Sequence, residues 1–255
     1  MNFSVFCSVG RNVLRRGYAK EMIHKLGLRA RSKARGERRE ESVAWARSRA
    51  ESLDEFARSL DAELWETSQR FGADLQAHAE RRLSEVGEAF GGGGDYRLLY
   101  FLVRHLRPQV VVETGVAAGF SSAAILQAMA ECGTGQLYSS DFPYVRLHDP
   151  EKHIGCVVEE ELRDRWKLRT QGDRVNLPAF ANELSRIDMM HYDSDKSYEG
   201  RELALAVLGP KFSKSTIIVF DDIQDNFHFR DWIVTQEHTA RVFEFGGKWV
   251  GLVGI

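Results

Sequence analysis

A chain of 255 residues is long enough for one large domain, or for one domain with an appendage. Hydrophobic residues make up 43% of the chain and charged residues 28%, which excludes a wholly disordered or collagen-like protein. The net charge is −2, yet residues 1–50 alone carry +9, so a basic arm precedes an acidic remainder.

A basic arm is compatible with binding to nucleic acid, an anionic membrane or an acidic partner. It is more often a solvated helix, and we expect no nucleic-acid partner. Phe3, Val5 and Phe6 precede the first arginines, the reverse of the order in a secretory signal. No apolar run approaches the ~20 residues that span a bilayer, so we expect no transmembrane helix. Three widely spaced cysteines without a Cys-x-x-Cys pair favour a cytoplasmic protein without disulfides or zinc.

Residues 41–90 have the periodicity of two amphipathic helices. Their apolar residues recur at steps of three and four: Leu53, Phe56, Leu60 and Leu64, then Phe71, Leu75, Ala79, Leu83, Val86 and Phe90. Four glycines follow at 91–94, and we place a domain boundary there. Residues 1–94 would then form the basic arm and a helical extension, and residues 95–255 the main domain. Because amphipathic helices bury their apolar stripes, we expect a homo-oligomer built through this extension.

From residue 95 onward, short apolar strands alternate with helices. Asp95 is placed to cap a helix that runs through Leu106 and ends before Pro108. The expected strands are residues 110–113, 136–140, 167–170, 187–192, 215–220, 241–245 and 248–254. The last two flank Gly246-Gly247, a hairpin turn, and are therefore antiparallel. We predict an α/β, doubly wound, Rossmann-like sheet of seven mostly parallel strands with a C-terminal antiparallel hairpin.

A glycine-containing turn, residues 113–122, follows the first strand and enters a helix. Glycines at 115 and 119 would let the backbone turn sharply, and the helix N-terminus offers N–H groups to a ligand. Tight packing in any α/β protein explains the same glycines, and the third glycine of the dinucleotide pattern is missing. Asp141 ends the second strand and could accept hydrogen bonds from ribose hydroxyls, or simply face water.

Three carboxylates end two neighbouring strands: Asp193 after one, Asp221 and Asp222 after the next. Carboxyl ends of parallel strands lie on one edge, so these side chains would converge. Oxygen ligands of this kind suit a hard divalent cation such as Mg²⁺, although each Asp could also cap a helix. Lys196 lies in the same turn and is either a base with a lowered pKa or a surface lysine.

These residues resemble a family, the class I S-adenosylmethionine-dependent methyltransferases. The chain is most similar to small-molecule and sugar O-methyltransferases related to the catechol O-methyltransferase-like and methyltransferase family 24 proteins. The resemblance runs from about residue 95 to 255 and rests on the turn Asp-Ser-Asp-Lys-Ser-Tyr-Glu at 193–199, on Asp-Asp-Ile at 221–223 and on the closing hairpin.

The resemblance implies a set of site residues. Residues that would bind S-adenosylmethionine are Glu113, Gly115, Ala117, Gly119, Ser121, Asp141, Asp173 and Asp193. It implies a metal site at Asp193, Asp221 and Asp222, and Lys196 as the catalytic base. Asp222 stands where these enzymes usually have Asn, and the basic N-terminal region has no counterpart in them.

The expected activity is metal-assisted transfer of a methyl group from S-adenosylmethionine to a hydroxyl of a small molecule or sugar. A metal-dependent enzyme of another reaction type and a non-catalytic binding module are the alternatives. Two features stay open. Residues 142–166 are either a substrate lid or a solvated excursion, and His228 either lines an acceptor pocket or covers the core.

Overall fold

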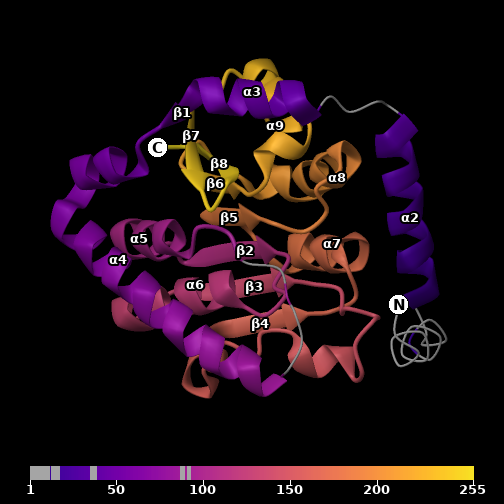
Figure 1. The fold of residues 1–255 in the computed structure, drawn as a ribbon, viewed down its shortest axis with the longest axis horizontal. Helices are drawn as coiled ribbons and strands as arrows, with labels where there is room; N and C mark the ends of the chain where they lie inside the picture. The colour runs from indigo at the N-terminus through magenta and orange to yellow at the C-terminus, as the bar shows by residue number, and fades with distance from the viewer. Residues whose placement is uncertain (1–11, 13–17, 35–38, 87–89, 91–92) are drawn as a thin grey trace.

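The computed structural model describes residues 12, 18–34, 39–86, 90 and 93–255. Its centre is an eight-stranded sheet with helices on both faces (Figure 1). The strands are β1 Ala50–Glu51, β2 Val110–Thr114, β3 Gln136–Ser140, β4 Trp166–Arg169, β5 Met189–Tyr192, β6 Ile217–Phe220, β7 Ala240–Phe245 and β8 Lys248–Val253. They lie in the order β1-β7-β8-β6-β5-β2-β3-β4.

The predicted fold class is confirmed. Strands β2 to β6 are parallel, while β8 runs antiparallel to both β6 and β7. The seven predicted strands are all present. The eighth, β1, comes from the N-terminal region and pairs with β7. It has only two residues, both exposed, so it carries no apolar alternation that a sequence pattern could reveal.

Alternation along each strand sends side chains to two separate cores. Val111 and Met189 pack in the core beneath α4 (Leu53–Val86), α5 (Tyr96–Leu106) and α6 (Phe120–Cys132). Val112 and Met190 pack on the opposite face, beneath α7 (Asp173–Glu183), α8 (Tyr198–Leu208) and α9 (His228–Thr235). Asp95 caps α5 by accepting hydrogen bonds from the backbone N–H groups of the next turn.

The helical extension shares the first of these cores. Within α4 the backbone leaves helical geometry at Asp61, whose carboxylate accepts a hydrogen bond from the N–H of Leu64 at 2.9 Å. Beyond this break Trp65 packs edge-on against Phe101 of α5, with ring centroids 5.7 Å apart. The periodicity of residues 41–90 predicts two helices, whereas the structure has one helix over Arg39–Arg49 and a second, α4, that breaks at Asp61.

Replacing Trp65 by Ala is expected to lower the free energy of unfolding by ~3–5 kcal/mol, because a large buried side chain leaves a cavity. Trp65 is 1% exposed. Denaturant unfolding measures the loss, and Leu60→Ala, on the same helix but 36% exposed, is the matched control. A loss below ~1 kcal/mol for Trp65→Ala would mean that α4 contributes little to this core.

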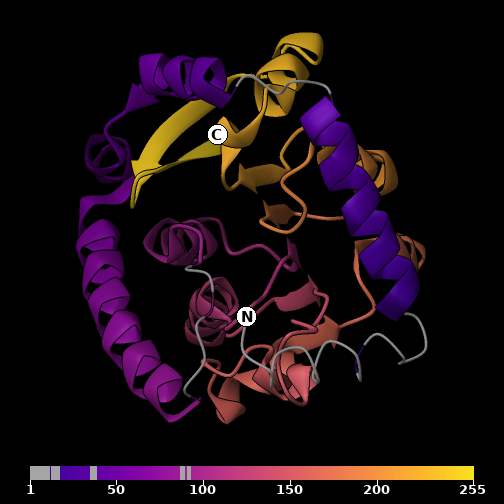
Figure 2. The same cartoon turned by 45° about the vertical axis from the view of Figure 1, so that its right-hand side comes forward.

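Two earlier helices complete the extension. Helix α2 (Tyr18–Ala34) packs on α8 along the side of the molecule, and α3 (Arg39–Arg49) lies over β7 and the short helix η4 (Ile223–Asp225) (Figures 1 and 2). Residues 1–11 of the basic arm and two of the four glycines, Gly91 and Gly92, lie outside the described residues. Among the helices that are described, none has the length and apolar character needed to cross a membrane.

Candidate active site

The carboxyl ends of the central strands open onto a cavity of about 610 Å³. Cavities of this size are typical of small-molecule sites. The turns after β2, β3, β4, β5 and β6 form its wall, together with residues of α2 and α8 and the first residue of β8. The candidate site residues that line it are Gly115, Ala117, Asp141, Asp173, Asp193, Lys196 and Asp222. Glu113, Gly119, Ser121 and Asp221 are not among its lining residues.

The turn between β2 and α6 is packed so closely that it needs its small residues. Gly115 has φ +80°, and a Cβ atom there would lie 2.4 Å from the carbonyl oxygen of Asp193. Gly119 has φ +98°, and a Cβ atom there would lie 2.8 Å from the Cα atom of Gly155. These positions lie in the left-handed region that favours glycine. The packing of the turn against neighbouring backbone therefore requires both glycines, whether or not a ligand is bound.

Glu113 and Ser121 lie beneath the glycine turn. Glu113 is fully buried, and its Oε2 accepts hydrogen bonds from the hydroxyls of Ser122 at 2.6 Å and Ser139 at 2.7 Å. Its Oε1 lies 3.8 Å from Nδ1 of His191, the neighbouring residue on β5. Ser121, in the first turn of α6, is 2% exposed. The hydrogen bonds of Glu113 thus link β2 with α6 and β3.

Two further carboxylates line the cavity at the ends of β3 and β4. Asp141 accepts hydrogen bonds from the N–H of Ala117 at 2.9 Å and from the N–H of the next residue at 2.7 Å. Asp173, at the start of α7, accepts hydrogen bonds from the hydroxyls of Ser140 at 2.6 Å and Ser194 at 2.5 Å. These donors fix the position of both carboxylates in the wall of the cavity.

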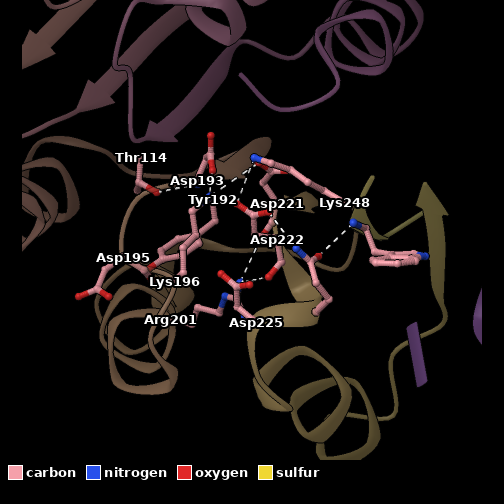
Figure 3. Close-up of polar contacts among 12 residues, drawn as sticks. Thr114, Tyr192, Asp193, Asp195, Lys196, Arg201, Asp221, Asp222, Asp225 and Lys248 are labelled. Atoms are coloured by element: carbon pink, nitrogen blue, oxygen red, sulfur yellow. Dashed lines mark hydrogen bonds and ion pairs between the residues drawn. The ribbon is translucent and has the colours of Figure 1, made fainter. Parts of the chain in front are cut away.

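The structure brings Asp193, Asp221 and Asp222 together beside the cavity (Figure 3). One carboxylate oxygen of each lies within 4.8 Å of the others. The ammonium of Lys196 donates to Asp193 and, at 2.7 Å, to Asp222, and it lies 3.7 Å from Asp221. Both oxygens of Asp221 are buried and accept no hydrogen bond from any described residue. We call these three aspartates the acidic cluster.

Burial and charge shift the proton affinities in this cluster. Burial raises the pKa of the Asp193 carboxyl to about 7, although Lys196 opposes the shift. Burial acts in the same direction on Asp222, but the charges of Lys196 and Lys248 outweigh it and hold its pKa at about 2. Burial alone would lower the pKa of Lys196, but the neighbouring carboxylates raise it above its ordinary value. In this structure Lys196 is therefore a charged counterion of the acidic cluster.

Lys248 also reaches the acidic cluster and is absent from the sequence analysis. Its Nζ lies 3.3 Å from Asp222 and 3.6 Å from Asp221. It is the first residue of β8, which runs antiparallel to β6. A strand that runs antiparallel to its neighbour begins at the sheet edge where that neighbour ends. The sequence feature that could have predicted this position is a lysine directly after the hairpin turn.

The 142–166 insertion and the N-terminal helix both contribute to the cavity. Tyr144 lines it from the insertion, and Glu21 and His24 line it from α2. The two segments touch each other, because the ring of Tyr18 lies 5.0 Å from that of Phe142. The insertion is thus part of the cavity wall. No periodic pattern could place α2 here, since its docking depends on residues more than a hundred positions away.

His228 does not line the cavity. It is fully buried, and its Nε2 lies 2.9 Å from a carboxylate oxygen of Glu202. Burial lowers the pKa of His228 to about 3, so the ring is neutral. Of the two roles open from the sequence, covering the core fits this position.

Residues 112–223 match the family model described as a methyltransferase domain. This part of the chain is similar to a methyltransferase domain. This confirms the resemblance inferred from the motifs. A search among curated proteins finds no match to the sequence.

Solved structures share the fold. A methyltransferase from Geobacter sulfurreducens is 20% identical, with a TM-score of 0.54, over 71% of this chain and 88% of that one. An O-methyltransferase from Bacillus cereus in complex with SAH is 16% identical, with a TM-score of 0.51, over 82% of this chain and all of that one. An SAH-bound methyltransferase from Podospora anserina is 13% identical, with a TM-score of 0.52, over 74% of this chain and 94% of that one.

Proposed function

We propose that this methyltransferase transfers a methyl group from S-adenosylmethionine to a hydroxyl of a small molecule or sugar, assisted by a divalent cation. The observation that carries the proposal is the acidic cluster beside a cavity at the carboxyl edge of a methyltransferase sheet. Two solved structures with this fold contain SAH, S-adenosylhomocysteine, which is what remains of S-adenosylmethionine after methyl transfer. Their bound SAH supports S-adenosylmethionine as the donor. Residues 95–255 would form the catalytic domain.

Binding of the donor would use the wall formed by the turns after β2, β3 and β4. Gly115 and Ala117 leave backbone exposed to the cavity at the end of β2, where the amino-acid part of the donor would lie. Asp141 would accept hydrogen bonds from the ribose, and Asp173 would lie near the adenine; both residues line the cavity. Glu113, Gly119 and Ser121 would act from below, by holding the turn in place.

Replacing Asp141 by Ala is expected to weaken binding of S-adenosylmethionine by ~1–3 kcal/mol, because the ribose hydroxyls lose a charged acceptor in a partly buried site. Titration calorimetry with S-adenosylhomocysteine measures the change. Asp149→Ala, in the insertion that follows Asp141 but outside the cavity lining, is the matched control. Equal affinities of wild type and Asp141→Ala would remove Asp141 from the donor site.

The acidic cluster fits a hard divalent cation. All of its ligand atoms are carboxylate oxygens, which Mg²⁺ prefers. Asp221 buries two oxygens that accept no hydrogen bond from a described residue, a costly arrangement for a carboxylate that nothing else satisfies. Asp193, Asp221 and Asp222 would hold the ion. When bound, the cation would lower the pKa of the acceptor hydroxyl and offset the carboxylate charges that raise the pKa of Lys196.

Lys196 would then receive the acceptor proton. Its side chain is mostly buried, and burial favours the neutral amine once the carboxylate charges are offset. Lys196 lines the cavity, and its Nζ donates a hydrogen bond to Asp222 of the acidic cluster. In-line positioning of donor and acceptor supplies much of the remaining rate enhancement.

Two measurements test the proposal. Calorimetry should show binding of S-adenosylhomocysteine and none of NAD, and the opposite result would overturn the choice of donor. Incubation with labelled donor and a panel of catechols, phenols and sugars, analysed by mass spectrometry, should show an acceptor that gains one methyl group on oxygen. Transfer only to nitrogen or carbon would contradict the reaction type.

A further inference from the structure

A fully buried arginine lies directly behind the acidic cluster. Arg201, on α8, is 0% exposed. Its Nη2 donates hydrogen bonds to the carbonyl oxygens of Asp221, at 3.1 Å, and Asp222, at 2.7 Å. Its Nη1 donates to Oδ1 of Asn226, at 3.1 Å. One guanidinium thus binds three acceptors in the turn that follows β6.

The conformation of this turn needs such support. Asp222 has φ +51°, in the left-handed region that residues other than glycine rarely adopt. The two carbonyl groups that Arg201 binds stand on either side of the φ and ψ angles of Asp222. Fixing both carbonyls fixes those angles. It thereby directs the Asp222 carboxylate toward Lys196, to which it is bound at 2.7 Å.

Asn226 connects the same arginine to the second acid-bearing turn. Its Nδ2 donates to the carbonyl oxygen of Lys196 at 2.7 Å, while its Oδ1 accepts from Arg201. Residues 193–197 and residues 221–226 are therefore joined through one amide. The hydroxyl of Ser42, on α3, donates to the carbonyl oxygen of Asn226 at 2.9 Å, so the helical extension supports this joint from outside.

The cost of this arrangement argues for a specific role. The acceptors of Arg201 are neutral carbonyl and amide oxygens, and its Nε has no hydrogen-bond partner among the described residues. Burying a charge without a directly bound countercharge is unfavourable, and an apolar side chain would fill the same space at lower cost. What an apolar side chain lacks is the planar set of donors that binds three acceptors in fixed directions.

We propose that Arg201 and Asn226 form a clamp that fixes the two acid-bearing turns relative to each other, so that the acidic cluster keeps the geometry that a cation requires. The inference rests on the proposed function, because cation binding is the purpose that the clamp would serve. Neither residue lines the cavity, so both are positioning residues.

The test uses Arg201→Lys, which keeps the positive charge but loses the planar fork. Hydrogen exchange of the backbone amides should become at least about tenfold faster in both turns, residues 193–197 and 221–226. The dissociation constant for Mn²⁺, measured by electron paramagnetic resonance without donor, should rise ~10–100-fold, as for other residues that orient metal ligands. In the methylation assay kcat should fall while KM for S-adenosylmethionine stays within about twofold.

Asn226→Ala provides a second variant that leaves the buried charge in place, and it decides the matter if Arg201→Lys does not fold. It should accelerate exchange in residues 193–197 in particular, since it removes the bond to the Lys196 carbonyl. Arg97→Lys is the matched control, because the Arg97 guanidinium donates to Asp95 and not to the described residues of either acid-bearing turn, and it should change none of these readouts.

Unchanged exchange, or faster exchange confined to residues 221–226 in both variants, would overturn the clamp. Unchanged Mn²⁺ affinity in both variants would overturn its role in shaping the cation site. If the wild-type protein binds no Mn²⁺, the cation in the proposed function fails and so does the purpose given to the clamp. The exchange measurement still decides whether the two turns are mechanically joined.

Discussion

Replacing Asp193 or Asp221 by Ala is expected to abolish divalent-cation binding and to lower kcat on the order of 10³-fold, because a cation supplies several kcal/mol of charge stabilisation in the transition state. Asp221 is 1% exposed, and neither of its carboxylate oxygens accepts a hydrogen bond from a described residue. Calorimetric titration with Mg²⁺ and the labelled-donor assay measure the two effects.

Asp195→Ala is the matched control for this prediction. Asp195 lies in the same turn and lines the cavity but is not a member of the acidic cluster. Mg²⁺ affinity should be retained in Asp195→Ala and lost in the other two variants. Normal cation binding by Asp221→Ala would contradict the assignment of the ligands.

The affinity for the cation should also depend on pH. The pKa of Asp193 is raised to about 7, so a proton competes with the cation below that pH. Affinity should therefore rise by up to about tenfold per pH unit as the pH approaches 7 from below, and level off above it. Asp222, with its pKa held at about 2, is ionised throughout this range and adds no dependence. A series of cation titrations from about pH 5 to 8, which brackets the pKa of Asp193, measures how the affinity depends on pH. Constant affinity across this range would contradict a cation held by Asp193.

Replacing Lys196 by Ala is expected to lower kcat ~10²–10⁴-fold at saturating Mg²⁺, because the acceptor proton loses its base. Affinity for S-adenosylhomocysteine should change little. The same variant separates the two roles of Lys196. In the absence of a cation, Lys196→Ala removes a buried countercharge of the acidic cluster. This loss should lower the free energy of unfolding by ~3–5 kcal/mol.

Saturating Mg²⁺ should restore the stability of Lys196→Ala but not its kcat. Thermal unfolding with and without Mg²⁺ measures the stability of the variant. Single-turnover methyl transfer measures its rate of catalysis. Lys248→Ala is the control, since it removes the other ammonium near Asp222 while leaving Lys196 in place, and its kcat should fall far less. Full recovery of kcat in Lys196→Ala on adding Mg²⁺ would limit Lys196 to a counterion.

Most of the sheet could be predicted from the sequence, because strand periodicity and strand ends are local features. The strand predicted at residues 136–140 is correct at both ends, and the strand before Asp193 differs only at its start, where the pattern begins at 187 and β5 begins at Met189. The same local reasoning places carboxylates at the ends of neighbouring parallel strands, so they face one edge.

The parts that sequence reasoning missed depend on docking between distant segments. Arg201 lies near the start of α8, at a position where a charged residue normally faces solvent, and only the packed fold reveals that it faces the turn after β6. Lys248 reaches the acidic cluster because β8 inserts beside β6. Glu21 meets the cavity because α2 docks along α8. None of these positions has a periodic signature, since each is fixed by tertiary contacts alone.

The most direct measurement is methyl transfer from labelled S-adenosylmethionine to a hydroxylated acceptor, assayed before and after removal of divalent cations with EDTA. The account predicts transfer to oxygen that stops in excess EDTA and returns when Mg²⁺ is added back in excess of the chelator. Full methyl transfer in excess EDTA would contradict the cation mechanism and would leave Asp193, Asp221 and Asp222 as a purely structural cluster.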